Sequence, residues 1–136
     1  MGEFRRASTE RVNVFPDGDR LVFKQYFEED AVFDRLRRYY NGDEYRFEVP
    51  PEDFDGVEHF LERHGYGLVV VEDVTPFTVV VRKYTDHPED IFRNAVLHRS
   101  EPRHNLFVMR DRAAVEQATL QGAVPLAEAD LADPFG

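Results

Sequence analysis

The chain of 136 residues carries 27 acidic and 17 basic residues, which gives a net charge of −10. It contains no Cys, and this excludes disulfides, thiolate zinc sites and Cys nucleophiles. Its length and its hydrophobic content of 42% predict one compact domain, residues 1–136, with a hydrophobic core. No apolar run is long enough to span a membrane, so we expect a cytoplasmic protein.

The basic residues are almost all Arg, since Lys24 and Lys83 are the only two Lys against 15 Arg. At molar salt the Debye length falls to about 3 Å, which screens the repulsion among carboxylates. Arg is more weakly hydrated than Lys and pairs bidentately with carboxylates. An ordinary acidic domain, or a genome whose codons favour Arg, gives a similar composition. We expect a halophilic protein.

The first elements along the chain are two strands and a helix. Residues 11–15 and 20–27 read as strands on either side of the turn residues 16–19. The acidic residues 28–30 then open a helix, because negative charge is favourable at a helix N-terminus. The expected apolar face of this helix consists of Val32, Phe33, Leu36, Tyr39 and Tyr40.

A strand, a helix and a further strand follow. Residues 45–49 alternate apolar and polar residues, which predicts a strand after the turn at Asn41. A second helix begins at Pro50 and Pro51 and ends at Gly65. The apolar run 68–71 predicts a strand in the centre of a sheet.

The second half of the chain also alternates strands and helices. Asp111 is the expected N-cap of a helix that stops at Gly122. The other expected elements are a strand over residues 78–84, a short helix from Pro88, a hairpin of strands 95–100 and 103–109, and a last short strand over 126–131.

The two halves resemble each other when the chain is shifted by 58 residues without gaps. Nine of the 57 positions from Val22 to Thr78 are then identical, whereas chance gives about four. Asp53 pairs with Asp111, and both lie where a helix N-cap is expected. The other identical pairs are Val22/Val80, Tyr26/Tyr84, Arg35/Arg93, Val57/Val115, Glu58/Glu116, Leu68/Leu126, Pro76/Pro134 and Phe77/Phe135.

This shift predicts two repeats, residues 20–77 and 78–136. Each repeat has the order strand, helix, two short strands, helix, strand, which is the βαββαβ order of a ferredoxin-like unit. We therefore expect an α+β fold of two tandem pseudo-repeats of about 58 residues, preceded by an N-terminal strand. The alternative is that two unrelated α+β stretches share the same order of strands and helices by chance.

Residues 93–112, called the basic segment below, have a local net charge of +3. Clustered Arg side chains can bind phosphate or carboxylate groups through paired hydrogen bonds. The alternative is that these side chains pair with the protein's own carboxylates, and high salt weakens phosphate contacts further. The candidate ligands of an anion or a nucleic acid are Arg93, Arg99, Arg103, His104, Arg110 and Arg112.

Known catalytic and metal motifs are not found in the sequence. His59 and His64 are five residues apart, whereas a zinc-binding helix needs a spacing of four, where Arg63 stands. Neither a G-x-S-x-G elbow nor a phosphate-binding Gly-rich loop occurs. We expect no metal site and no cofactor.

The leading functional hypothesis is a non-enzymatic protein-interaction or regulatory module. Its expected partner is another protein or a second copy that pairs through an exposed strand edge. One alternative is nucleic-acid or small-anion binding through the basic segment. The other is a small enzyme with a site in the cleft between the two halves, with His98 or His104 as the base and Arg93 as the anion anchor.

Overall fold

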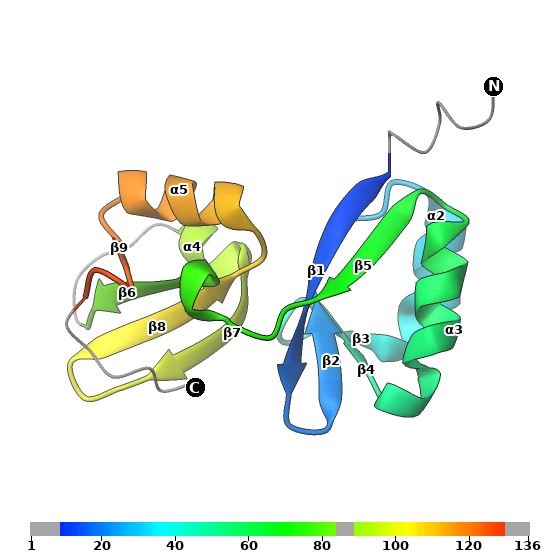
Figure 1. Cartoon of the computed structure of the whole chain (residues 1–136), viewed down its shortest axis with the longest axis horizontal. Helices are drawn as coiled ribbons and strands as arrows, with labels where there is room; N and C mark the ends of the chain where they lie inside the picture. Colours follow the sequence, from blue (N-terminus) through cyan, green and yellow to red (C-terminus); the bar gives the residue numbers. More distant parts are fainter. Residues whose placement is uncertain (1–8, 84–88, 130–136) are drawn as a thin grey trace. The chain divides into compact units, whose positions relative to one another are not determined.

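The structure is a computed structural model that describes residues 9–83 and 89–129. The chain divides into two compact units, Met1–Val71 and Glu72–Gly136 (Figure 1). Each unit has its own sheet and its own helices, so the α+β class expected from the sequence is confirmed. Within the described ranges, no helix combines the length and the apolar character needed to cross a bilayer.

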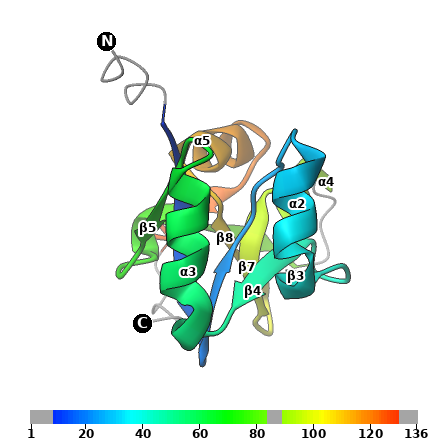
Figure 2. The ribbon, with the colours of Figure 1, turned by 90° about the vertical axis from the view of Figure 1, so that its right-hand side faces the viewer.

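The first unit contains a five-stranded sheet with the order β3-β4-β2-β1-β5. Neighbouring strands are antiparallel, except that β1 and β5 are parallel. Two helices lie on one face of this sheet (Figures 1 and 2). The elements are β1 (Glu10–Asp17), β2 (Arg20–Phe23), α2 (Asp30–Leu36), the 3-10 helix η1 (Arg37–Tyr39), β3 (Tyr40–Asn41), β4 (Arg46–Val49), α3 (Pro51–Glu62) and β5 (Tyr66–Val70).

Aromatic rings form much of the core of the first unit. The ring of Phe47 on β4 stacks on Phe23 at 5.2 Å between centroids and meets Tyr40 edge-on at 5.0 Å. Such ring pairs contribute more to the stability of the fold than the apolar area that they bury accounts for. The aliphatic and remaining aromatic members of this core are Val12, Val14, Phe27, Val32, Leu36, Val49, Phe54, Val57, Leu61 and Leu68.

The second unit contains a four-stranded sheet with the order β7-β8-β6-β9, in which all neighbours are antiparallel. Ile91 of one helix and Val115 of the other pack against Val79 and Phe107, so both helices cover the same face. The elements are η2 (Thr75–Phe77), β6 (Thr78–Arg82), α4 (Glu89–Arg93), β7 (Ala95–Ser100), β8 (His104–Met109), α5 (Arg112–Leu120) and β9 (Val124–Pro125).

Several local predictions are confirmed. The hairpin of β7 and β8 has the expected bounds to within one residue. Asp111 is the N-cap of α5, because its Oδ1 accepts a hydrogen bond of 2.7 Å from the N–H of Ala114. Gly122 follows this helix with a φ of 105°, a conformation that favours glycine.

Two predictions about the helices of the first unit are wrong. The first helix ends at Leu36, and Tyr40 lies instead in β3, where it pairs with Phe47. Sheet pairing and ring contacts thus override the helical spacing of the apolar residues. Asp53 is not an N-cap, because Pro50 has the extended backbone of the cap and Asp53 N–H donates to the Pro50 carbonyl at 3.0 Å.

Two predictions about strands are also wrong. Residues 68–70 of the apolar run 68–71 belong to β5, which lies at the edge of its sheet and not in the centre. The last strand is Val124–Pro125, and the chain then turns, since Ala129 N–H donates to the Pro125 carbonyl at 3.1 Å. The part of the predicted strand at residues 130–131 lies outside the described residues.

Candidate functional site

The basic segment is divided between the two ends of the β7–β8 hairpin. Arg110 N–H donates to the Asn94 carbonyl at 2.9 Å, which places Arg93, Arg110 and Arg112 at one end. Arg99, Arg103 and His104 lie at the opposite end, beside the turn. Six residues of extended strand separate the two groups by about 20 Å. One small anion therefore cannot contact both groups.

Arg99 and Arg110 of the basic segment each have a carboxylate partner nearby in sequence. Arg99 Nε lies 3.2 Å from Glu101 Oε1, and Arg110 Nε lies 3.5 Å from Asp111 Oδ2. These pairs are partly exposed, and pairs of this kind contribute about 0–1 kcal/mol. The anion or nucleic-acid site remains a prediction.

The strand register places one further cation, Arg82, near the turn end of the basic segment, and the sequence did not indicate this residue. Arg82 on β6 lies opposite His104 on β8, and Arg99 on β7 lies opposite Leu106. Because side chains alternate along each strand, Arg82, His104 and Arg99 share one face of the sheet. His98 lies on the other face, where its ring contacts Phe92 at 5.5 Å between centroids. His98 and His104 therefore point to opposite faces.

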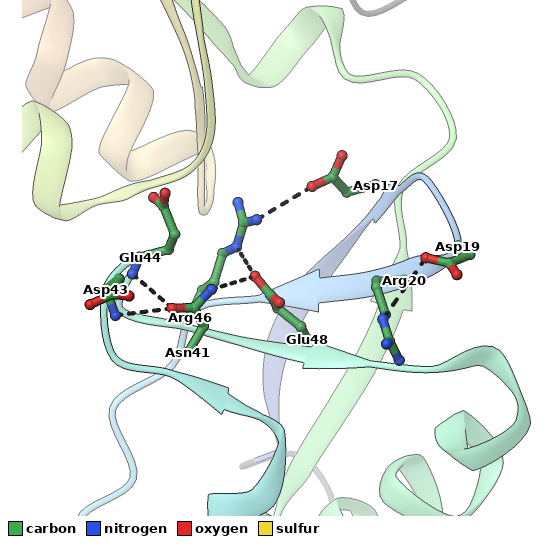
Figure 3. A network of polar contacts seen from close by, with 8 residues as sticks. All are labelled: Asp17, Asp19, Arg20, Asn41, Asp43, Glu44, Arg46 and Glu48. Atoms are coloured by element: carbon green, nitrogen blue, oxygen red, sulfur yellow. Dashed lines mark hydrogen bonds and ion pairs between the residues drawn. The ribbon is translucent and has the colours of Figure 1, made fainter.

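A half-buried ion-pair network lies on the face of the first sheet that carries no helix (Figure 3). Arg46 Nε is 2.8 Å from Glu48 Oε2, and Arg46 Nη2 is 3.4 Å from Asp17 Oδ2. The Asn41 amide donates to the same Glu48 oxygen at 3.1 Å. Arg46 is only 14% exposed, so this network is a structural part of the unit.

Burial and the neighbouring charges of this network have opposite effects on the pKa of Glu48. Burial raises the pKa of Glu48, but the hydrogen bonds from Arg46 and Asn41 and the positive charges of Arg46 and Arg20 outweigh it. The net effect is a pKa below the ordinary value of 4.5. Glu48 is thus an ionised ion-pair partner at neutral pH and not a candidate proton donor.

The first unit also has a hollow of about 440 Å³ between the end of α2 with η1 and the adjacent α3. Its apolar lining comes from both sides, and its rim carries charged groups of both signs. We call it the α2–α3 hollow. It is lined by Arg35, Leu36, Arg38, Tyr39, Glu52, Asp53, Gly56, Val57 and Phe60.

Hydrogen bonds connect η1 with α3 at one end of this hollow. Arg38 Nη2 donates to Tyr39 Oη at 2.7 Å, and Tyr39 Oη donates to Asp53 Oδ2 at 3.0 Å. Arg38 also lies 3.6 Å from Asp53 Oδ2. The hydrogen bond to the Tyr39 hydroxyl is the main cause that raises the pKa of Arg38 above its ordinary value, and the charge of Asp53 acts in the same direction.

The other end of the hollow carries an isolated cation. The guanidinium of Arg35 lies over the ring of Phe60 at 5.6 Å from its centroid, which is a cation–π distance. Within the described part of the chain, Arg35 has no carboxylate partner. The sequence offered one local signal for this site, namely Gly56 in the interior of an otherwise ordinary helix.

The outer edge of β5 is a separate candidate surface. Gly65 accepts a hydrogen bond of 2.8 Å from Glu10, and Val71 donates one of 2.8 Å to Val14. Backbone groups alternate along a strand, so every second residue between Gly65 and Val71 points away from β1. These residues are Tyr66, Leu68 and Val70. Among the described strands, none pairs with this side of β5.

Comparison with known proteins identifies no relative of this chain. No family model matches it. Searches of the curated proteins and of the solved structures return no match either. In residues 9–83 and 89–129, no group of three or more His, Asp or Glu side chains is arranged to hold a metal ion.

Proposed function

We propose that this protein is a protein-interaction module that pairs with a second copy of itself through the outer edge of β5. The observation that carries the proposal is the mismatch between the composition of β5 and its position. Residues 68–71 are all apolar, as in a strand buried on both sides, yet β5 lies at an edge. Val69 and Val70 are 39% and 42% exposed.

The other sheet edges lack this combination. β3 and β9 have two residues each, and short edge strands resist pairing. β7 is longer, but it carries His98 and Arg99 and has a register irregularity between Ala95 and Leu97. Charges and bulges are the features that protect edges. β5 has neither, so it is the edge suited to a partner.

A second copy fits this edge in antiparallel register about Leu68. Leu68 then lies opposite its own equivalent, and Tyr66 lies opposite Val70 of the second copy. All three present outward backbone groups, so the pairing forms about six hydrogen bonds. The arrangement is two-fold symmetric, as most homodimers are.

The flanking charges support this register. Glu72 and Asp73 follow β5, whereas Arg63 and His64 precede it, and all four are exposed. In the antiparallel pairing, the acidic end of one strand meets the basic end of the other. The net charge of −10 on each copy opposes association, and molar salt screens this repulsion.

Sedimentation velocity of the full chain in about 2 M KCl tests the proposal. We expect a dimer for the wild type and a monomer for Val70→Pro, which removes an outward N–H and leaves the bonds to β1 intact. Val70→Lys should also be monomeric. Val124→Lys is the matched control, since Val124 is 43% exposed on β9 and should not affect the dimer. A monomeric wild type, or a dimeric and folded Val70→Pro, would refute the proposal.

The two units are, in this proposal, descendants of a duplicated ferredoxin-like βαββαβ unit. Without β1, the first unit has the element order of the second. The strand orders also agree, because β3-β4-β2-β5 corresponds to β7-β8-β6-β9 once β1 is set aside. β1 then represents an additional strand inserted between β2 and β5.

Strand register supports the duplication independently. Leu21 pairs with Val49, and 58 residues later Val79 pairs with Phe107. The neighbouring pairs of β2 with β4 also match those of β6 with β8 at this shift. The hairpin registers differ by two residues, since Tyr40 pairs with Phe47 whereas His98 pairs with Phe107. An experimental structure with different strand orders in the units would refute the duplication.

The composition further supports a protein of a high-salt cytoplasm. Arg outnumbers Lys, and Arg is the cation in the ion pairs with Asp34, Glu48 and Glu101. Arg is the cation suited to such pairs because its guanidinium matches a carboxylate. A salt-dependent dimer is consistent with such a setting.

A further inference from the structure

The α2–α3 hollow has opposite charge at its two ends. Arg35 stands beside Phe60 at one end. At the other end, Glu52 and Asp53 face a single cation, Arg38, which already lies near Asp53. The local balance is therefore positive at the Phe60 end and negative at the start of α3.

The spacing of the two ends follows from the geometry of α3. Asp53 and Phe60 are seven residues apart, which corresponds to about 10 Å along a helix. Between the ends, Leu36 and Val57 are buried and provide an apolar floor.

Gly56 keeps the middle of the hollow open. It lies in the interior of α3, where glycine weakens a helix. A Cβ at this position would meet nothing within 4 Å, so close packing does not require glycine here. A larger side chain would occupy the hollow, and the glycine therefore has a role in access to the floor.

We infer that the α2–α3 hollow binds a small zwitterion of dipeptide size, with its carboxylate at Arg35 and its ammonium group at Glu52 and Asp53. The volume of about 440 Å³ lies within the range of small-ligand sites. A simple anion would meet repulsion from Glu52 and Asp53, and a simple cation would meet repulsion from Arg35 and Arg38. A ligand with separated charges satisfies both ends, and its apolar side chains cover Leu36 and Val57.

NMR titration of the full chain with the dipeptide Ala-Leu tests this inference. We expect saturable shifts confined to α2, η1 and α3. Ala-Leu amide lacks the carboxylate, N-acetyl-Ala-Leu lacks the ammonium group, and each should bind about tenfold more weakly. Equal affinity for the three ligands, or no shift at about 10 mM Ala-Leu, would overturn the inference.

Variants assign each end of the ligand. Arg35→Gln should weaken Ala-Leu about tenfold and leave the affinity for its amide unchanged, because the amide has no carboxylate to lose. Glu52→Gln should likewise weaken Ala-Leu about tenfold and leave the affinity for N-acetyl-Ala-Leu unchanged, because that compound has no ammonium group. Arg112→Gln, an exposed Arg of the other unit, is the matched control and should bind as the wild type does. An equal loss for all ligands in Arg35→Gln would contradict the assignment.

Filling the hollow is an independent test. Gly56→Leu should abolish binding, whereas its circular dichroism and melting behaviour should stay those of a folded protein. Retained binding in Gly56→Leu would place the ligand elsewhere and refute the inference. The monomeric Val70→Pro should still bind Ala-Leu, since β5 lines no part of this hollow. The result thus does not depend on the proposed dimer.

Discussion

Arg46 Nε lies 2.8 Å from Glu48 Oε2, and the two side chains are 14% and 26% exposed. Because the guanidinium is largely removed from water, its positive charge needs the negative charge of the Glu48 carboxylate for compensation. Glu48→Gln should lower the free energy of unfolding by about 1–3 kcal/mol. Urea unfolding measures the loss. Asp17→Asn is the control, since its more exposed contact with Arg46 should be worth under about 1 kcal/mol. Similar losses in both variants would contradict this account.

The same pair predicts a pH dependence. The pKa of Glu48 is lower in the folded state than its ordinary value of 4.5. Its contribution to stability is therefore fully present above pH 4.5 and is lost as the pH falls through the folded-state pKa. The stability difference between wild type and Glu48→Gln should shrink below pH 4.5. A constant difference down to acid unfolding would show that the charge of Glu48 is not responsible.

The N-cap of α5 should be worth a measurable amount. Asp111 accepts a hydrogen bond of 2.7 Å from Ala114 N–H. Asp111→Ala should cost about 1 kcal/mol in thermal or denaturant unfolding. Asp111→Ser keeps a capping oxygen and should recover most of the loss. No recovery with Ser would indicate that the pairing with Arg110, and not the cap, stabilises this region.

Gly56→Ala should stabilise the protein by about 0.5–1 kcal/mol, because alanine is the better residue in a helix interior and no atom lies within 4 Å of the added Cβ. Gly65→Ala is the opposite case. Gly65 has a φ of 90°, which strains any residue with a side chain, so this variant should lose stability. Differential scanning calorimetry of both variants measures the two signs. A loss of stability in Gly56→Ala would mean that the helix is distorted there.

Salt should raise the stability of the protein. The net charge of −10 is spread over 136 residues, and molar KCl screens the resulting repulsion. The melting temperature should therefore be higher in about 2 M KCl than in dilute buffer. Measurement with Val70→Pro, which we expect to be monomeric, separates this effect from dimer formation. An equal or higher melting temperature in dilute buffer would refute the halophilic assignment.

Local features of the fold were predictable because they depend on residues close together in sequence. The β7–β8 hairpin and the Asp111 cap follow from alternation and capping within a few positions. The class of the fold also followed from the order of such elements. The limits of the first helix were less predictable, since the pairing of Tyr40 with Phe47 in β3 competes with its helical spacing.

The candidate sites depend on contacts between distant residues, and the sequence contained only hints of them. The α2–α3 hollow requires Arg35 to lie over Phe60 and Tyr39 to meet Asp53, and Gly56 was its one local signal. The basic segment was evident as a run of charge, but strand direction places its members at two ends of a hairpin. Proximity along the chain is not proximity in an extended structure.

By itself, the sequence determined the charge, the α+β class and most of the local elements of this protein. Only the tertiary structure decided that β5 is an edge strand and that α2 and α3 enclose a hollow. The physical reason is that an apolar run indicates how much of a strand is to be buried, but not which other element of the fold buries it. The pairing of residues 10–14 with 66–70 is a long-range choice, and it leaves one side of β5 open.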